Sequence, residues 1–195
     1  MSRTVNEQRP EELLAAIVRY LTAHGLADLS LRPLAKAVGS SPRVLLYYFG
    51  SKEKMIVDVL AEVRRQQVAC FGEISGATFG EGCRLTWKLM SAPDSEPLFR
   101  LFFEAYGIAL QRPKLYKDFL RATIEDWVNL VADDLCREGY RREDARAFAT
   151  VVLAGFRGFM LDYCNTRDRK RVDRAVVMWT NSLDEMLARL KQRSS

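Results

Sequence analysis

The sequence predicts an all-α protein of about nine helices, on three observations. Apolar residues recur at intervals of three and four, which is the spacing of a helix face, and no run alternates polar and apolar residues as a strand would. Serine, proline and glycine stand where helices would begin and end. The chain of 195 residues, 48% of them hydrophobic, can bury a core without a disulfide or a metal.

The first predicted helix covers residues 10–24. Pro10 suits the first helical position, and Gly25 is placed to end the helix. The only histidine, His24, closes this helix, and we expect it to cap the helix end. The apolar face of the helix carries Leu13, Ile17 and Leu21.

Two short helices and a long one are expected next. Ser30 is a natural N-cap for a helix that stops at Gly39. Ser41 and Pro42 open the following helix, as cap residue and first-position proline. A long fourth helix is predicted over residues 51–71, with its first residue as the cap.

A larger helical bundle is predicted after the fourth helix. We expect two domains, residues 1–50 and residues 51–195. Four glycines make residues 72–82 a loose joint in this prediction, and a proline-containing break precedes a helix that starts near Pro97. Three further helices are predicted over residues 119–139, 143–164 and 176–190.

Charge and cysteine content limit the class of protein. The net charge of +5 and the pI near 9.1 permit binding to a polyanion. A basic run, residues 167–171 with Arg174, is expected in a solvated loop between the last two helices, with a second nucleic-acid contact as the alternative. The cysteines have no CxxC spacing and no nearby histidine, so we expect reduced thiols and neither a metal nor a cofactor. They are Cys70, Cys83, Cys136 and Cys164.

Targeting signals are not expected. Residues 1–21 include charged side chains and a proline rather than the apolar run of a signal peptide. No stretch approaches the ~18 apolar residues that a membrane span needs. The sequence therefore predicts a cytoplasmic protein with no membrane partner.

Residues 30–52 have the pattern of a helix-turn-helix: two short helices joined by a tight glycine turn. Serine and arginine near the helix starts suit phosphate, because backbone N–H groups and the helix dipole attract anions there. We therefore expect the second short helix to enter the major groove of duplex DNA. The candidate DNA contacts are Ser30, Arg32, Ser40, Ser41, Pro42, Arg43, Tyr47, Tyr48 and Lys52.

These candidates have different expected roles. Arg43 can read a guanine through two hydrogen bonds, whereas Tyr47, Tyr48 and Lys52 suit phosphate. Alternatives stay open for three of them. Either tyrosine can instead be an ordinary half-buried aromatic residue, and Lys52 can be a solvated surface charge.

The runs SLRPLAKAVGSS (residues 30–41) and LLYYFGSKE (residues 45–53) resemble the DNA-binding domain of TetR-family repressors. The resemblance covers about residues 10–55. It departs at three places: Pro33 replaces a residue that is often acidic in the family, Arg43 replaces a frequent glycine, and Leu46 replaces the usual tyrosine. The resemblance implies a homodimer that binds a palindromic operator, usually as a repressor. It also implies a C-terminal domain that dimerises and encloses a small-molecule effector.

Aromatic residues on the middle helices suggest where an apolar or aromatic effector would bind. The alternative for each is plain core packing. The candidates are Trp87, Met90, Phe99, Phe102, Phe103, Tyr106, Trp127 and Phe156.

The last two helices are the candidates for dimerisation, since Gly155 and Gly158 would let a partner helix approach and the final helix has a regular apolar seam. The alternative is that this seam packs within its own subunit. The candidate interface residues are Val152, Gly155, Phe159, Trp179, Leu183, Met186 and Leu190.

Two other classes of protein fit the sequence less well than a DNA-binding regulator. An enzyme is disfavoured because the sequence has no phosphate-binding glycine loop, no GxSxG, no HExxH and no cysteine–histidine pair. A helical ligand-binding or adaptor protein, whose DNA-binding segment has lost its function, is the second alternative.

Overall fold

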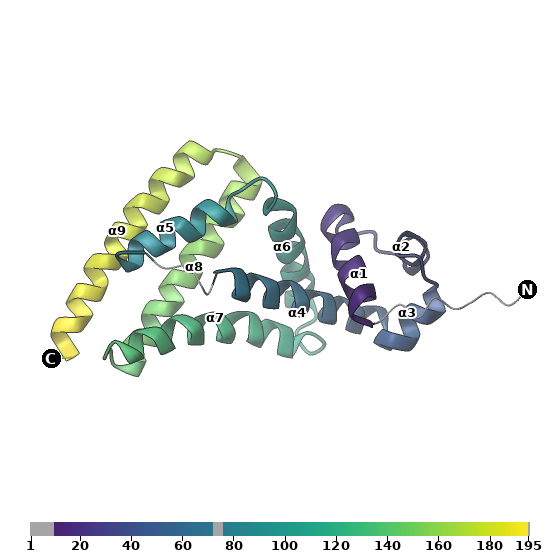
Figure 1. Cartoon of the computed structure of the whole chain (residues 1–195), viewed down its shortest axis with the longest axis horizontal. Helices are drawn as coiled ribbons and strands as arrows, with labels where there is room; N and C mark the ends of the chain where they lie inside the picture. The colour runs from purple at the N-terminus through teal and green to yellow at the C-terminus, as the bar shows by residue number, and fades with distance from the viewer. Residues whose placement is uncertain (1–9, 72–75, 195) are drawn as a thin grey trace, which may run out of the picture.

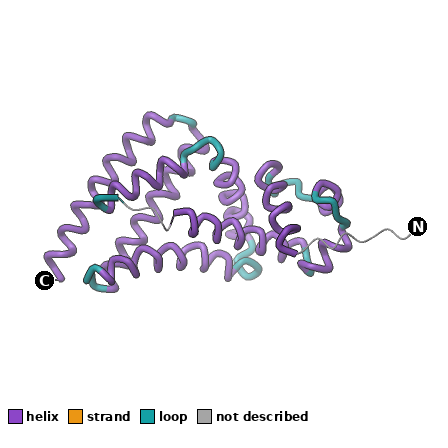
Figure 2. The backbone as a smooth tube through the Cα atoms, in the orientation of Figure 1, coloured by secondary structure: helices purple, strands orange, loops and turns teal. Residues whose placement is uncertain are grey.

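The computed structural model describes residues 10–71 and 76–194, and this part of the chain forms nine α-helices and no strand (Figure 1, Figure 2). The prediction of an all-α protein is confirmed. The helices are α1 (Pro10–His24), α2 (Leu31–Ala37), α3 (Pro42–Phe49), α4 (Lys52–Phe71), α5 (Phe79–Met90), α6 (Glu96–Gln111), α7 (Lys117–Arg137), α8 (Arg142–Thr166) and α9 (Arg169–Ser194).

Helices α1, α2 and α3 form a group at one end of the molecule, and α5 to α9 form the larger part (Figure 1). Helix α4 runs from the small group into the larger part, where it contacts α6 and α7. Helix α9 lies along the edge farthest from α3 (Figure 1). The N-terminal group and the C-terminal bundle are therefore joined by one continuous helix.

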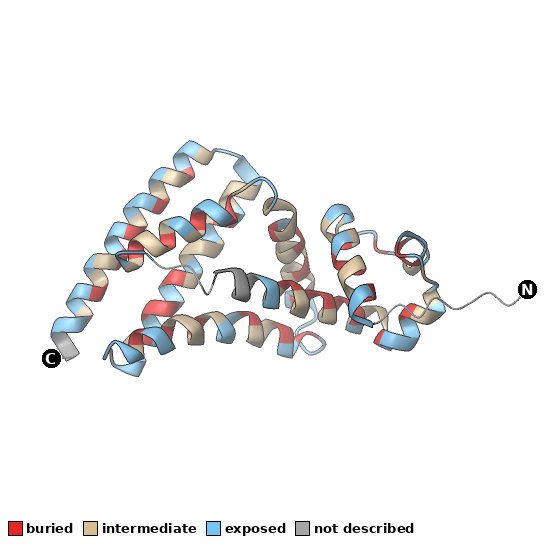
Figure 3. Cartoon of the chain, viewed as in Figure 1, coloured by how far each residue is buried: buried red, intermediate tan, exposed pale blue. Residues whose placement is uncertain are grey.

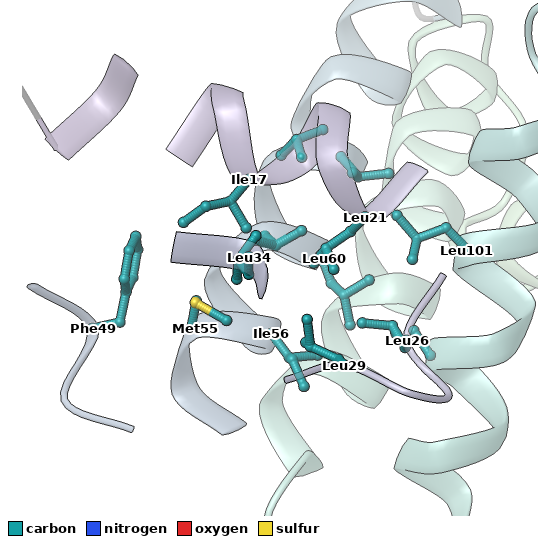
Figure 4. Packing of buried hydrophobic residues seen from close by; sticks show 14 of the residues in the cluster. Ile17, Leu21, Leu26, Leu29, Leu34, Phe49, Met55, Ile56, Leu60 and Leu101 are labelled. Atoms are coloured by element: carbon teal, nitrogen blue, oxygen red, sulfur yellow. The ribbon is translucent and has the colours of Figure 1, made fainter. Parts of the chain in front are cut away.

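The hydrophobic core of the N-terminal group extends beyond its own three helices. Ile17 of α1 and Leu34 of α2 are fully buried, together with Met55 of α4 (Figure 4). Leu101 and Ala105 of α6 belong to the same cluster. The expected boundary after residue 50 thus falls inside a shared core, so a displacement of α6 acts directly on the packing of the small group.

The turn between α2 and α3 has a glycine for a geometric reason. Gly39 has φ = 68°, in the left-handed region where a side chain is strained. The Ser40 N–H donates to the Ala35 carbonyl at 2.8 Å and the Gly39 N–H donates to the Lys36 carbonyl at 3.3 Å, as in a Schellman turn. The predicted stop at Gly39 is confirmed.

Two of the three expected serine caps form hydrogen bonds. The Ser41 hydroxyl accepts the Val44 N–H at 3.3 Å, and the Ser51 hydroxyl accepts the Lys54 N–H at 3.0 Å. Ser30 has the extended backbone of an N-cap residue, but its hydroxyl makes no cap hydrogen bond. The His24 ring nitrogen lies 2.9 Å from the Tyr20 carbonyl at the end of α1, which agrees with the expected capping role.

Of the predicted loose joint, residues 72–75 lie outside the described residues, and Gly80 and Gly82 lie inside α5. The Gly80 N–H donates to the Asp184 carboxylate of α9 at 2.8 Å. A Cβ at Gly80 would lie 2.5 Å from that carboxylate and 2.6 Å from the Thr180 carbonyl. The glycine therefore lets α5 and α9 approach closely, and it does not loosen the chain.

The basic run after α8 is also placed differently from the prediction. Only Arg167 and Asp168 connect α8 to α9, and the remaining residues of the run belong to α9. Arg171 pairs with Asp162 at 2.6 Å, Arg169 pairs with Asp173 at 3.4 Å, and Arg167 pairs with Glu96. The run is therefore only partly a loop, and its arginines are at least partly exposed as expected while they also pair with carboxylates of α6, α8 and α9.

Helix α8 is long and apolar enough to cross a membrane by length and composition, and it is the one such helix in the described part of the chain. This is weak evidence for a span, since core helices of soluble proteins pass the same test. One side of α8 is buried and includes Phe148, Ala149 and Met160, whereas the opposite side is exposed (Figure 3). The helix therefore has an inward face and a second apolar face that no residue of the described chain covers.

Candidate nucleic-acid interface and ligand cavity

Helix α3 packs on the N-terminal core with one face and presents the other to solvent. Leu45 and Phe49 are buried. The exposed residues of the helix define what we call the α3 outer face: Arg43, Leu46, Tyr47 and Tyr48. The face is convex and carries hydrogen-bond donors, which is what a helix needs to enter a major groove.

The two tyrosines differ in exposure. The Tyr47 side chain is 82% exposed, which is incompatible with an ordinary half-buried aromatic, whereas Tyr48 is 40% exposed. Their rings meet edge to face with centroids 5.4 Å apart. Both side chains lie on the outer face, where their phenols can donate to phosphate oxygens.

Charge near α3 is strongly biased. Residues 30–54 contain the basic side chains Arg32, Lys36, Arg43, Lys52 and Lys54 and a single acidic one, Glu53. Neither α2 nor α3 has an acidic residue in its first turn. The N-termini of both short helices therefore keep the positive field that favours phosphate.

The structure assigns Lys52 a contact that sequence reasoning missed. Its Nζ donates to the Leu29 carbonyl, and the side chain is only partly exposed. The lysine thus ties the start of α4 to the loop before α2. It is not a fully solvated surface charge, and its ammonium has two further hydrogens for a phosphate.

The other predicted DNA contacts lie around the same turn. Ser30, Arg32 and Ser41 are exposed, and Ser40 and Pro42 are partly exposed. All belong to the segment from the start of α2 to the first turn of α3. The structure thus brings the nine predicted residues to one end of the molecule.

The fold and this end of the molecule define a helix-turn-helix protein with a helical C-terminal bundle. Residues 13–59 match the family model described as bacterial regulatory proteins, tetR family. No curated protein sequence matches the chain significantly. Residues 13–59 are therefore similar to the DNA-binding part of the tetR family, as the resemblance in the sequence implied.

Solved structures extend the likeness to the whole chain. A transcriptional regulator from Rhodococcus sp. Rha1 superposes with a TM-score of 0.75 at 18% identity, covering 90% of this chain and 96% of that one. A TetR transcriptional regulator from Legionella pneumophila gives 0.64 at 18% identity over 91% and 98%. The multidrug binding protein EbrR, complexed with imidazole, gives 0.63 at 21% identity over 89% and 96%. The chain has the fold of TetR-family transcriptional regulators.

A cavity of about 540 Å³ lies within the C-terminal bundle, lined by residues from α5 to α9. This volume is in the range of small-molecule sites. Six of the eight predicted effector-binding residues line it: Met90, Phe99, Phe102, Phe103, Trp127 and Phe156. Most of these side chains are aromatic, so the walls suit a flat apolar molecule.

The other two predicted residues lie outside the cavity wall. Trp87 is buried in the core, where its indole N–H donates to Asp173 at 2.7 Å. Tyr106 stacks on Phe102 with centroids 5.7 Å apart, behind the cavity wall. For Trp87 the alternative of plain packing is the one that the structure favours.

Polar groups also line the cavity. Asp184 accepts hydrogen bonds from the Thr78 hydroxyl at 3.0 Å and from the Gly80 N–H, and Asp134 pairs with Arg137. Burial, and to a lesser degree the charge of Asp184, raises the pKa of the Cys83 thiol to about 12, so the thiol is neutral and unreactive at physiological pH. Among the described residues no group of three or more His, Cys, Asp or Glu is placed to hold a metal ion.

Arg157 is one of the cavity residues that sequence reasoning missed. A signal was present, because Arg157 is the only charged residue in the apolar stretch of residues 147–161. A lone charge in such a stretch must either leave the core or have a function inside it.

The predicted dimer seam faces the interior of its own subunit. Val152 and Leu183 are buried in the C-terminal core, and Met186 and Leu190 pack against the same cluster. The rings of Trp179 and Phe159 meet with centroids 5.3 Å apart inside the subunit. The close approach allowed by Gly155 is also internal, since a Cβ there would lie 2.4 Å from the Trp179 ring. These seven residues therefore make contacts within their own subunit, and their part in a dimer interface stays a prediction.

A different apolar surface of α8 and α9 is exposed. We call it the α8–α9 outer face and define it by Val151, Leu161 and Met178, which are 41%, 53% and 73% exposed. Gly158 belongs to the same side of α8, with no atom within 4 Å of the position of an added Cβ. The sequence signal for this face is a stripe of small and apolar residues that recurs every three or four positions, and the structure leaves this stripe exposed. Its residues are Ala147, Val151, Ala154, Gly158 and Leu161.

Proposed function

We propose that this protein is an effector-responsive transcriptional repressor that binds a palindromic operator as a homodimer and is released by a small organic effector. The observation that carries the proposal is the pairing of two features in one chain. The exposed α3 outer face lies at one end of the molecule, within a segment rich in basic residues. An aromatic-lined cavity lies in the bundle, whose helix α6 also packs in the N-terminal core. A cytoplasmic location and a non-enzymatic role follow from this function.

Helix α6 is the element that couples cavity to DNA in this proposal. Phe99 and Phe103 of α6 line the cavity, whereas Leu101 and Ala105 pack in the N-terminal core. Glu104 of the same helix accepts the Leu26 N–H at 2.9 Å, in the loop between α1 and α2. An effector that displaces Phe103 therefore moves groups that hold the helix-turn-helix in place.

Dimerisation through the α8–α9 outer face is the second part of the proposal. Large exposed apolar patches on otherwise polar surfaces mark protein interfaces. Two-fold pairing on this face would present two copies of α3, and operator binding requires these to be one turn of DNA apart, roughly 34 Å. An effector that changes this distance releases the operator.

The multidrug binding protein EbrR supports the cavity as the effector site only by analogy, since its fold is shared and its sequence is distant. The direct support is the size of the cavity and its aromatic wall.

The primary test is selection of bound duplexes from a random DNA pool by the purified full-length protein. We expect enrichment of a palindrome whose half-sites lie one helical turn apart, bound by two chains. Affinity should fall steeply with salt, and the selected site should outlast random DNA as salt rises. A protein that prefers no duplex over another contradicts the proposal and favours a helical ligand-binding protein without DNA function.

Arg43 is expected to read one base pair of each half-site. Arg43→Ala should reduce discrimination at a single operator position by about 1–3 kcal/mol, since a bidentate contact to guanine is lost. Competition binding against operators mutated at each position measures this. Arg189→Ala is the matched control, because this exposed arginine lies on α9 at the far end of the molecule. Unchanged preference at every position in Arg43→Ala excludes a base-reading role.

Glu104 is expected to hold the α1–α2 loop on α6. Glu104→Ala removes the acceptor of the Leu26 N–H, and a hydrogen bond to a charged group contributes about 1.5–3 kcal/mol. Hydrogen exchange of the Leu26 amide should therefore accelerate roughly tenfold or more. Glu62→Ala on α4 is the control, since Glu62 bonds only to neighbours one turn away on its own helix. Equal protection of the Leu26 amide in wild type and Glu104→Ala would remove this contact from the coupling route.

A further inference from the structure

The guanidinium of Arg157 lies in the wall of the cavity among aromatic rings. Its Cζ lies 5.7 Å from the centroid of Phe102 and 5.4 Å from that of Tyr106. One nitrogen, Nη2, donates to the Thr123 carbonyl of α7 at 2.6 Å. The side chain is thereby held in one orientation, with three contacts that are all neutral.

Arg157 has no carboxylate partner among the described residues. Other arginines of the bundle, such as Arg64 and Arg171, pair with aspartates within 2.9 Å. Burial lowers the pKa of the Arg157 guanidinium, with a smaller opposing effect of Tyr106, yet an arginine remains charged in proteins. A partly buried cation without a counter-ion carries a desolvation cost, and an anion that enters the cavity would reduce that cost.

The acidic groups of the cavity lie away from Arg157. Arg157 bonds to the carbonyl of residue 123, whereas Asp134 and Glu138 lie 11 and 15 residues further along α7, roughly 16 and 22 Å at 1.5 Å per residue. Asp184 faces the N-terminus of α5, where Thr78 and Gly80 donate to it. The cavity therefore has a cationic end among aromatic rings and a separate acidic end.

We propose that the effector is an aromatic carboxylic acid whose carboxylate pairs with Arg157 and whose ring system lies between Phe102, Phe103 and Trp127. This inference rests on the proposed function and names its effector class. The planar guanidinium matches a carboxylate in two parallel hydrogen bonds. In a partly enclosed apolar site, such a pair discriminates against an uncharged ligand of the same shape.

Naphthalene-1-acetate and its neutral, nearly isosteric amide, naphthalene-1-acetamide, are the probes for the test. Titration calorimetry of the full-length protein should give roughly tenfold to a hundredfold tighter binding of the acid. Tryptophan fluorescence should change with the same midpoint, since Trp127 lines the cavity. Arg157→Met should bring the two affinities to within about threefold of each other, and Arg157→Lys should keep part of the preference. Arg100→Met is the control, as this exposed arginine of α6 does not line the cavity.

The comparison of acid and amide binding to the wild-type protein does not depend on the folding of any variant. Circular dichroism checks that each variant is folded. Equal affinity of acid and amide, preference for the amide, or no binding of the acid would overturn the inference. Operator binding is measured on the same preparations. If the protein binds its operator but does not prefer the acid, only this inference is contradicted. If it prefers the acid but binds no duplex, the proposed function is contradicted.

Discussion

Replacing Met178 with aspartate is expected to convert a dimer into a monomer and to reduce operator affinity by roughly a hundredfold or more. The Met178 side chain is 73% exposed on α9, adjacent in sequence to Trp179, whose ring lies against Gly155 of α8. Two-fold pairing would bury two aspartates without partners in an apolar surface. A monomer has one α3 and holds only a half-site. Sedimentation equilibrium and operator titration measure the two effects.

The same reasoning applies to Leu161→Glu on α8, and Leu110→Glu is the matched control. Leu161 and Leu110 are 53% and 58% exposed, but Leu110 lies near the end of α6, outside the α8–α9 outer face. Leu110→Glu should leave the dimer intact. A wild-type monomer in solution, or a Met178→Asp dimer with full operator affinity, would show that the chain assembles through another surface.

Gly155→Ala is expected to destabilise the protein, although alanine is the better helix former. The added Cβ would lie 2.4 Å and 2.5 Å from two carbon atoms of the Trp179 ring. Trp179 cannot retreat freely, because the rings of Phe156 and Phe159 meet it with centroids 5.1 and 5.3 Å away. Overpacking of this kind costs about 1–3 kcal/mol. The Tm in thermal unfolding should fall by roughly 2–4 °C per kcal/mol for a chain of this length.

Gly107→Ala is the control for this prediction, because a Cβ at Gly107 of α6 meets no atom within 4 Å. That variant should be as stable as the wild type or more stable by up to about 1 kcal/mol. Trp179→Leu should partly restore the stability of Gly155→Ala by giving the new methyl group space. If Gly155→Ala and Gly107→Ala raise the Tm equally, α8 and α9 are further apart than described.

Much of the N-terminal domain was predictable because its signals are local. A cap hydrogen bond, a left-handed glycine and a first-position proline each depend on a few neighbouring residues. Ser41, Pro42 and Gly39 therefore marked the helix-turn-helix correctly. Ser30 shows the limit of this reasoning, since its backbone has the N-cap conformation but its hydroxyl does not cap.

The partners of each side chain in the bundle were not predictable in the same way. Helical periodicity shows that a face is apolar, but it does not show what covers that face. The seam with Val152 and Leu183 was expected to meet a second subunit, and it instead fills the core of its own. Gly80 was expected in a loose joint, and it instead admits Asp184 against α5.

The sequence by itself determined the all-α class, the helix-turn-helix and most of the aromatic cavity wall, because these depend on local conformation and on periodicity. Only the tertiary structure decided which apolar face of α8 is buried, since that follows from how α7 and α9 pack around it. It also decided that Arg157 has neutral partners in the cavity wall. A contact between residues far apart in the chain depends on how their helices pack, so the residues near each of them in the sequence do not reveal it.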